Sequence, residues 1–259
     1  MISVEGTLRE NKASGKGSLV GYFPAGYPTV EDSVEALVAM AKNGCDVLEI
    51  GVPYSDPVMD GVVIQKATEQ ALENGFRLRQ LFDVIKGVRA EVDTPLLVMS
   101  YWNPVLRFGA EKFADELKES GAQGMITPDL IPDEAETWLE NSKRLDLDRV
   151  FLVAPSSSAE RVKANSDQSR GFVYSVSTMG ITGERTELDR LAREVVSKVR
   201  SVSDVPTCVG VGVSSAEQVR EVNEYADGAI VGTAFIKAYQ ESGLDGLVAK
   251  TRELAGGLG

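Results

Sequence analysis

The sequence predicts an α/β protein, a single (β/α)8 TIM barrel that occupies residues 1–259. Short apolar segments rich in β-branched residues alternate with longer amphipathic segments, and eight such units follow one another along the chain. Strands separated by helices imply right-handed crossovers and a parallel sheet. No shift in composition marks a domain boundary, and 259 residues is an ordinary length for one closed barrel.

The predicted strands come at the spacing expected of β/α units. They cover residues 18–23, 46–50, 95–101, 123–127, 149–153, 171–176, 206–210 and 228–232. The predicted helices cover residues 29–43, 110–120, 133–143, 185–201, 214–225 and 245–255. The first of these helices has the clearest ends, because Thr29 is a suitable N-cap and Gly44 follows its last turn.

Two additions to the plain barrel are predicted. Residues 5–12 form an extra N-terminal helix, which we expect to close the bottom of the barrel. A long insertion follows the second strand and holds an acidic loop and two helical segments, residues 62–74 and 78–91. Active sites of such barrels are built at the C-terminal ends of the strands, so the functional residues are expected there.

The composition limits what the chain can bind and which chemistry it can use. A net charge of −12 disfavours nucleic acid and anionic membranes as partners, although backbone N–H groups could still bind a small phosphorylated molecule. The chain has no histidine, which removes Ser–His and Cys–His nucleophiles and histidine-bound zinc, and no metal site is expected. We find neither an apolar run of membrane-spanning length nor a signal peptide, so we expect a cytoplasmic protein.

Residues 46–61 carry the strongest functional signal. Glu49 lies inside the apolar second strand, and Asp60 ends the Pro- and Asp-rich loop that follows. A barrel enzyme can present two carboxyl groups to one pocket in this way for acid–base catalysis. The alternative interpretation is that Glu49 faces water and that Asp56 and Asp60 serve turns and helix caps. A lysine Schiff base is disfavoured, because no lysine lies in or at the end of a predicted strand.

Glycines at the ends of the last two predicted strands indicate a phosphate site. Gly210 ends the seventh strand, Gly212 follows it, and Gly232 ends the eighth. Bare backbone N–H groups beside a helix N-terminus bind phosphate without a basic side chain, which suits an acidic chain. The alternative is that these glycines only permit tight turns. Residues 177–183, which follow the sixth strand and are mostly small, could form a lid.

The most specific motif in the chain is LEIGVPYSDP at residues 48–57, followed by Asp60-Gly61. It is accompanied by PAGYP at 24–28, YWNP at 101–104, PDL at 128–130, GITG at 180–183 and GVGVS at 210–214. With these motifs the chain resembles the α subunit of tryptophan synthase over nearly its whole length. The resemblance implies a (β/α)8 barrel that acts as a lyase, cleaving indole-3-glycerol phosphate to indole and glyceraldehyde 3-phosphate. It also implies an αββα complex with a β subunit that holds pyridoxal phosphate and condenses indole with serine; no cofactor is expected in this chain.

The resemblance also assigns roles to individual residues. Glu49 would be the general acid and base, Asp60 would stabilise the charge on the indole ring, and Tyr174 would assist. The implied substrate-binding residues are Tyr22 and Tyr101 against the indole, together with Asp129, Thr182, Gly183, Gly212, Gly232 and Thr233. The implied contacts with the β subunit are Pro53, Asp56 and Asn103.

Three positions depart from the family pattern. Met59 and Val62 flank the Asp60-Gly61 pair where a smaller residue and a proline are expected, and Thr233 stands where serine is usual. Thr233 keeps a hydroxyl for phosphate, whereas Met59 and Val62 bear on loop closure rather than on reaction type. Two alternative functions stay open: a stand-alone indole-3-glycerol-phosphate lyase, and a non-catalytic phosphate-binding subunit that regulates a partner. The presence of both Glu49 and Asp60 counts against the second.

Overall fold

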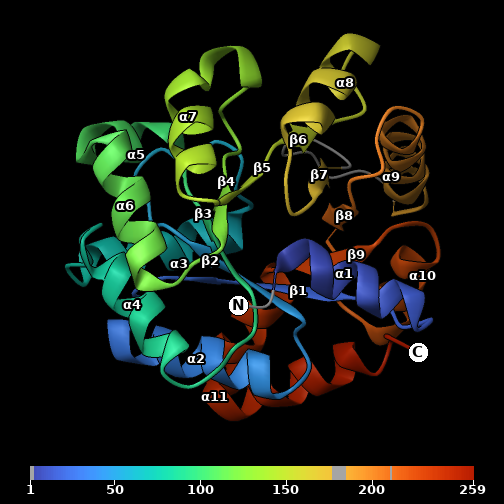
Figure 1. The fold of residues 1–259 in the computed structure, drawn as a ribbon. Coiled ribbons are helices and arrows are strands. Elements are labelled where there is room, and N and C mark those ends of the chain that lie inside the picture. Colours follow the sequence, from blue (N-terminus) through green and yellow to red (C-terminus); the bar gives the residue numbers. More distant parts are fainter. Residues whose placement is uncertain (1–2, 177–184, 211) are drawn as a thin grey trace.

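The computed structural model describes residues 3–176, 185–210 and 212–259, and these form a nearly closed barrel of parallel strands surrounded by helices (Figure 1). The strands are β1 Leu19–Pro24, β2 Val47–Gly51, β3 Leu96–Met99, β4 Gly124–Ile126, β5 Asp148–Val150, β6 Leu152–Val153, β7 Val173–Val176, β8 Thr207–Gly210 and β9 Gly228–Val231. Every pairing between them is parallel, in the order β5-β4-β3-β2-β1-β9-β8-β7-β6. The predicted barrel class is therefore confirmed.

The number of strands differs from the predicted eight, because the described part of the chain has nine strand segments. The predicted fifth strand, residues 149–153, is divided at Phe151 into β5 and β6. β5 pairs with β4 and β6 pairs with β7, so the two edges of the sheet are joined by the chain itself. This is how the sheet curls into a barrel.

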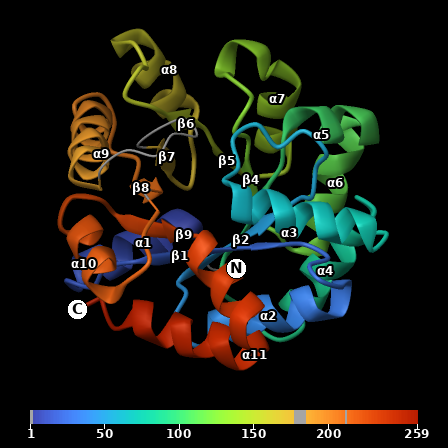
Figure 2. The same cartoon turned by 180° about the vertical axis from the view of Figure 1, so that it is seen from behind.

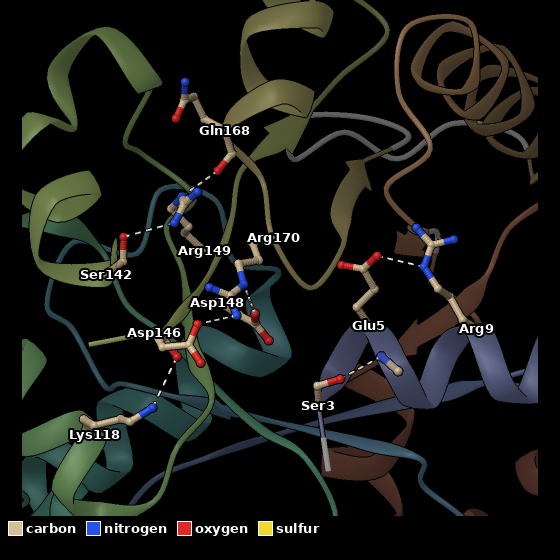
Figure 3. Close-up of polar contacts among 11 residues, drawn as sticks. Ser3, Glu5, Arg9, Lys118, Ser142, Asp146, Asp148, Arg149, Gln168 and Arg170 are labelled. Atoms are coloured by element: carbon tan, nitrogen blue, oxygen red, sulfur yellow. Dashed lines mark hydrogen bonds and ion pairs between the residues drawn. The ribbon is translucent and has the colours of Figure 1, made fainter. Parts of the chain in front are cut away.

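A polar network holds this seam together at the start of β5 (Figure 3). Arg149 and Arg170 exchange backbone hydrogen bonds of 3.2 and 2.8 Å. The Arg170 guanidinium pairs with Asp146 at 2.6 Å and with Asp148 at 3.4 Å. Asp148 is almost buried, and this burial raises its pKa to about 6 although Arg170 acts in the opposite direction. Lys118 adds a bond to the Asp146 carbonyl at 3.2 Å.

The helices occupy the positions that β/α units require. They are α1 Val4–Ala13, α2 Val30–Lys42, α3 Val62–Glu73, α4 Gln80–Arg89, α5 Trp102–Phe108, α6 Ala110–Ser120, the 3-10 turn η1 Pro132–Glu134, α7 Glu136–Arg144, α8 Ala159–Gln168, α9 Arg185–Arg200, α10 Ala216–Tyr225 and α11 Thr233–Ala255. Thr29 caps α2 as predicted, accepting from the Asp32 N–H at 3.1 Å. Helices α5 and α8 were not predicted. The predicted helix 245–255 is only the second half of α11, whose two parts meet at a kink at Ser242 and Gly243.

An apolar cluster fills the interior of the barrel, and the N-terminal helix closes one end of it. Seven residues of the strands and Phe172, just before β7, form one buried cluster: Val20, Val47, Leu97, Ile126, Val150, Phe172, Cys208 and Ile230. Val4 and Leu8 of α1 belong to the same cluster and are fully buried, so this helix closes the bottom of the barrel. Figure 1 shows α1 in front of the strands, and α3 comes to the front in the opposite view (Figure 2). Within the described residues, no helix combines the length and the apolarity needed to cross a membrane.

Candidate active site

Glu49 lies inside the barrel, near its mouth. It is the third residue of β2, in register with Tyr22 of β1 and Leu97 of β3. Val47, two residues earlier, belongs to the interior cluster, so strand alternation directs Glu49 inward as well. Its side chain is 1% exposed, and its Oε2 has no hydrogen-bond partner among the described residues. The alternative of a glutamate that faces water is therefore wrong.

The environment of Glu49 favours its protonated form. Burial, and after it the negative charge of Asp60, raises the pKa of Glu49 to about 8. At neutral pH most of the Glu49 side chains are therefore neutral and carry a proton. A carboxyl group in this state can act as an acid, and it becomes a base once the proton has left.

Asp60 reaches the same site from the loop between β2 and α3. Its backbone N–H donates to the Pro57 carbonyl at 3.0 Å, and its own carbonyl accepts from Gln65 Nε2 at 2.8 Å. The N-cap of α3 is Gly61, without a side-chain capping bond, so the Asp60 carboxylate does not cap this helix. Burial raises the pKa of Asp60 to about 7, and a hydrogen bond with the Tyr101 side chain acts in the opposite direction.

Three tyrosines surround the two carboxyl groups. Tyr22 on β1 and Tyr101 just after β3 are buried, whereas Tyr174 on β7 is partly exposed. Burial and the charges of Glu49 and Asp60 raise the pKa of Tyr22 and of Tyr174 well above the ordinary value. The pKa of Tyr101 is also raised, by burial and by Asp60. The structure thus brings together the predicted catalytic residues and the two predicted indole-facing tyrosines.

Glycines make room for these tyrosines, a role that the sequence did not reveal. A Cβ atom on Gly51 would lie 2.1 Å from the Tyr22 hydroxyl oxygen, and one on Gly210 would lie 2.7 Å from the Tyr174 hydroxyl oxygen. Gly232 also faces Tyr22, where a Cβ would lie 3.1 Å from Cδ1. Gly210 and Gly232 therefore form part of the packing around the aromatic rings, whatever else they bind.

Those predicted phosphate residues that the structure describes lie on two chain segments. Gly232 is the N-cap of α11 and Thr233 its first residue, and the first turn of a helix leaves backbone N–H groups without partners in the helix. Gly212 has a φ of +69°, which favours glycine, and open space where a Cβ would stand. Helix α10 begins at Ala216, two residues after the predicted start at residue 214, and Ser215 is its N-cap. Thr182 and Gly183, and the proposed lid 177–183, lie outside the described residues.

Asp129 makes a structural contact. Both of its carboxylate oxygens accept from the Trp102 N–H, at 2.9 and 3.1 Å, so the carboxylate ties the loop after β4 to the first turn of α5. A contact with substrate stays a prediction for this residue. In the described part of the chain, no three side chains of His, Cys, Asp or Glu are grouped so as to hold a metal ion.

The predicted partner contacts lie beside the site. Pro53 is buried, whereas Asp56 and Asn103 are exposed. The Asn103 side chain donates to the Tyr54 hydroxyl at 3.0 Å, and the Tyr54 ring lies 5.3 Å from the Tyr101 ring. Three large apolar side chains near these residues in sequence are exposed: Val58 at 77%, Val62 at 64% and Leu106 at 54%. Val62 is one of the departures from the family pattern, whereas Val58 and Leu106 were not singled out in the sequence.

A parallel barrel with a buried glutamate and a partly buried aspartate in its mouth, both with raised pKa values, is typical of an acid–base enzyme of the TIM-barrel class. A family model described as tryptophan synthase alpha chain matches residues 8–256. The tryptophan synthase alpha chain of Leifsonia xyli subsp. xyli is 52% identical over 257 residues, covering 99% of this chain and 98% of the relative. That of Mycobacterium avium is 51% identical over 243 residues, covering 94% and 89%. The chain belongs to the tryptophan synthase alpha chain family.

Solved structures agree with this assignment. A chain of Mycobacterium tuberculosis tryptophan synthase in an aminoacrylate-bound form has a TM-score of 0.92 and 46% identity, over 99% of each chain. The tryptophan synthase A-subunit of Pyrococcus furiosus has a TM-score of 0.85 and 35% identity, over 93% of this chain and 98% of the other. The barrel is thus similar throughout to those of the family.

Proposed function

We propose that the chain cleaves indole-3-glycerol phosphate to indole and glyceraldehyde 3-phosphate, as the alpha reaction of tryptophan synthesis. The observation that carries this proposal is the pair of carboxyl groups in the barrel mouth, Glu49 and Asp60, whose pKa values of about 8 and about 7 lie near neutrality. The reaction is a reverse aldol cleavage, which moves protons without a redox step. Two carboxyl groups of this kind suffice for it.

Glu49 serves as both acid and base in this scheme. Its proton goes to C3 of the indole ring, and the ring becomes a cation. The Glu49 carboxylate then takes the proton of the hydroxyl group next to the breaking bond. That C–C bond breaks, its electron pair neutralises the ring, and the former hydroxyl carbon becomes the aldehyde of glyceraldehyde 3-phosphate. Glu49 ends the cycle protonated, as it began.

Asp60 stabilises the charge that develops between these two proton transfers. Its ionised carboxylate, placed at the indole N–H, lowers the energy of the cationic ring. Tyr174 assists from β7, and Tyr22 and Tyr101 line the indole. Water has little access to Glu49, which is 1% exposed, so the electrostatic effect of Asp60 is weakly screened.

The phosphate is assigned to the last two strand ends. The N-terminus of α11, at Gly232 and Thr233, provides unpaired backbone N–H groups and partial positive charge. Gly212 adds backbone without a side chain, and Thr182 and Gly183 complete the predicted set. An anion held there places the glycerol phosphate end of the substrate at one side of the mouth and its indole near β1 to β3.

A β subunit with pyridoxal phosphate is the proposed partner, in an αββα complex in the cytoplasm. Pro53, Asp56 and Asn103 are assigned to the interface. Val58 and Val62, on either side of Asp60 in the sequence, and Leu106, three residues after Asn103, are exposed, and large exposed apolar side chains support a protein contact. The loop with Val58 also carries Asp60, so docking there would affect the acid pair. The proposed complex uses the cofactor only in the partner; none is assigned to this chain.

The test is an indole-production assay on purified chain, with and without a tryptophan synthase β subunit. The wild-type chain should release indole slowly alone and faster in the complex, and Glu49→Gln should release almost none in either condition. A correctly folded wild-type chain that leaves indole-3-glycerol phosphate intact in both conditions would contradict the proposed function. Full activity without a β subunit would point to the stand-alone lyase.

A further inference from the structure

The loop that carries Asp60 is held by two side chains. Gln65 in the first turn of α3 donates to the carbonyls of Asp60 at 2.8 Å and of Pro57 at 3.3 Å. Tyr101, just after β3, is the second, and its hydroxyl accepts from the Met59 N–H at 2.9 Å. Both side chains thus fix the main chain of the loop, and the Tyr101 hydroxyl, bonded to the residue before Asp60, acts to lower the pKa of the Asp60 carboxyl.

The hydroxyl of Tyr101 faces this loop and still has a hydrogen to donate there. A phenol group has one hydrogen to donate and oxygen lone pairs that accept. The oxygen accepts from Met59, and the hydrogen is available to the Asp60 carboxylate. The ring itself is 3% exposed and packs against Tyr54, with ring centroids 5.3 Å apart. A rigid strand end therefore fixes the position of this hydroxyl.

We infer that Tyr101 is a positioning residue, whose hydroxyl joins the Met59 backbone to the Asp60 carboxylate and holds that carboxylate in the barrel mouth. The inference rests on the proposed function for its consequence in catalysis, but the observed hydrogen bond from the Met59 N–H to the Tyr101 hydroxyl does not. It adds to the assignment of the Tyr101 ring to the indole, because the ring can line the substrate while the hydroxyl serves the loop.

The hydroxyl should also tune the charge of Asp60. The titratable groups that face Asp60 are Glu49 on β2, Tyr22 on β1, Tyr174 on β7 and Tyr101 itself. Among them Tyr101 stabilises the ionised form of Asp60 by hydrogen bonding. Without this hydroxyl the pKa of Asp60 should rise, and fewer of the molecules would have the ionised carboxylate at pH 7.

The variant Tyr101→Phe tests this directly, because it removes the hydroxyl and keeps the ring. Tyr54→Phe is the matched control: it removes a hydroxyl from the ring stacked on Tyr101, where the partner is Asn103 rather than Asp60. The pKa of Asp60 is measured by 13C NMR titration of chain labelled at aspartate, with Asp60→Asn to assign the signal. Tyr101→Phe should raise this pKa by about one pH unit, the effect of losing one hydrogen bond to a carboxylate. Tyr54→Phe should leave it unchanged.

Kinetics provide the second measurement. Tyr101→Phe should lower kcat by roughly tenfold or more with little change in KM, and move the acidic limb of the pH profile upward. An unchanged Asp60 titration in folded Tyr101→Phe overturns the inference, as does a raised KM with normal kcat and pH profile, which would make Tyr101 a substrate contact only. If the wild-type chain is not a lyase, the proposed function fails, and the NMR titration still decides whether Tyr101 controls Asp60.

Discussion

Replacing Glu49 with glutamine should abolish turnover and at the same time stabilise the fold. Glutamine keeps the shape of the side chain but cannot deliver or accept the proton, so the rate of indole formation should fall by at least ~10²–10⁴-fold. The gain in stability has a separate origin. Glu49 is 1% exposed, and its pKa rises from the ordinary 4.5 to about 8 in the folded chain. Folding therefore opposes its ionisation.

The sign and size of the stability effect follow from linkage. Between pH 4.5 and 8 the folded chain keeps the Glu49 proton while the unfolded chain has lost it, so the free energy of unfolding falls as pH rises. The slope for one proton is about 1.4 kcal/mol per pH unit. From about pH 5.5 to about pH 7.5 the wild-type chain should therefore lose roughly 2–3 kcal/mol that Glu49→Gln retains. Below pH 4.5 the difference in the free energy of unfolding between the two proteins should no longer change with pH.

Urea unfolding of both proteins across this pH range measures the difference, and the indole assay on the same samples measures the loss of activity. Glu69→Gln, on the exposed face of α3, is the control and should follow the wild type in both measurements. The reasoning is refuted if the free energies of unfolding of wild type and Glu49→Gln differ by the same amount at pH 5.5 and pH 7.5. It is also refuted if Glu49→Gln still produces indole at a near-normal rate.

Three further predictions concern the neighbours of Glu49. Asp60→Asn should reduce indole formation by ~10²-fold or more, because the cationic ring loses its counter-charge. It should also lower the pKa of Glu49, measured by carboxyl NMR; an unchanged pKa would mean that the charge of Asp60 does not act on Glu49. Thr233→Asp places a negative charge at the first residue of α11, which stabilises the helix but repels phosphate. KM should therefore rise ~10-fold without loss of stability, and an unchanged KM would mean that the phosphate binds at another site. Asp56→Ala should lose much of the activation by a β subunit while the isolated chain keeps its slow rate; equal activation in a titration with β subunit would remove Asp56 from the interface.

The residues that could be predicted are those whose signal is local. Glu49 stood out because a single acid interrupts an apolar strand, and Thr29 because capping depends on the next three residues. Helix α8 was missed since only Val162, Asn165 and Ser166 of it are buried, which leaves almost no apolar periodicity. Helix α5 was missed because it has seven residues and contains a proline. Neither helix has a local sequence pattern from which it could be predicted.

Roles that depend on distant residues could not be predicted. Whether a strand-end glycine makes room for a phosphate or for a tyrosine depends on what lies across the barrel. Gly51 faces Tyr22, and Gly210 faces Tyr174, only after the sheet has closed. The division of the fifth strand has the same cause, because each half of residues 148–153 pairs with a different neighbour.

The two acids differ in how their positions are fixed, and this difference indicates where regulation can act. Glu49 belongs to a strand paired on both sides and cannot move without disturbing β1 and β3. Asp60 depends on a loop held by Tyr101 and Gln65, next to the exposed Val58 and Val62. A partner that covers those apolar side chains would change the position and pKa of Asp60 far more than those of Glu49. Activation by a β subunit should therefore appear in kcat and in the acidic limb of the pH profile, where Asp60 titrates, with the limb that reports Glu49 nearly unchanged. A β subunit that shifts both limbs equally would mean that docking acts on the whole mouth.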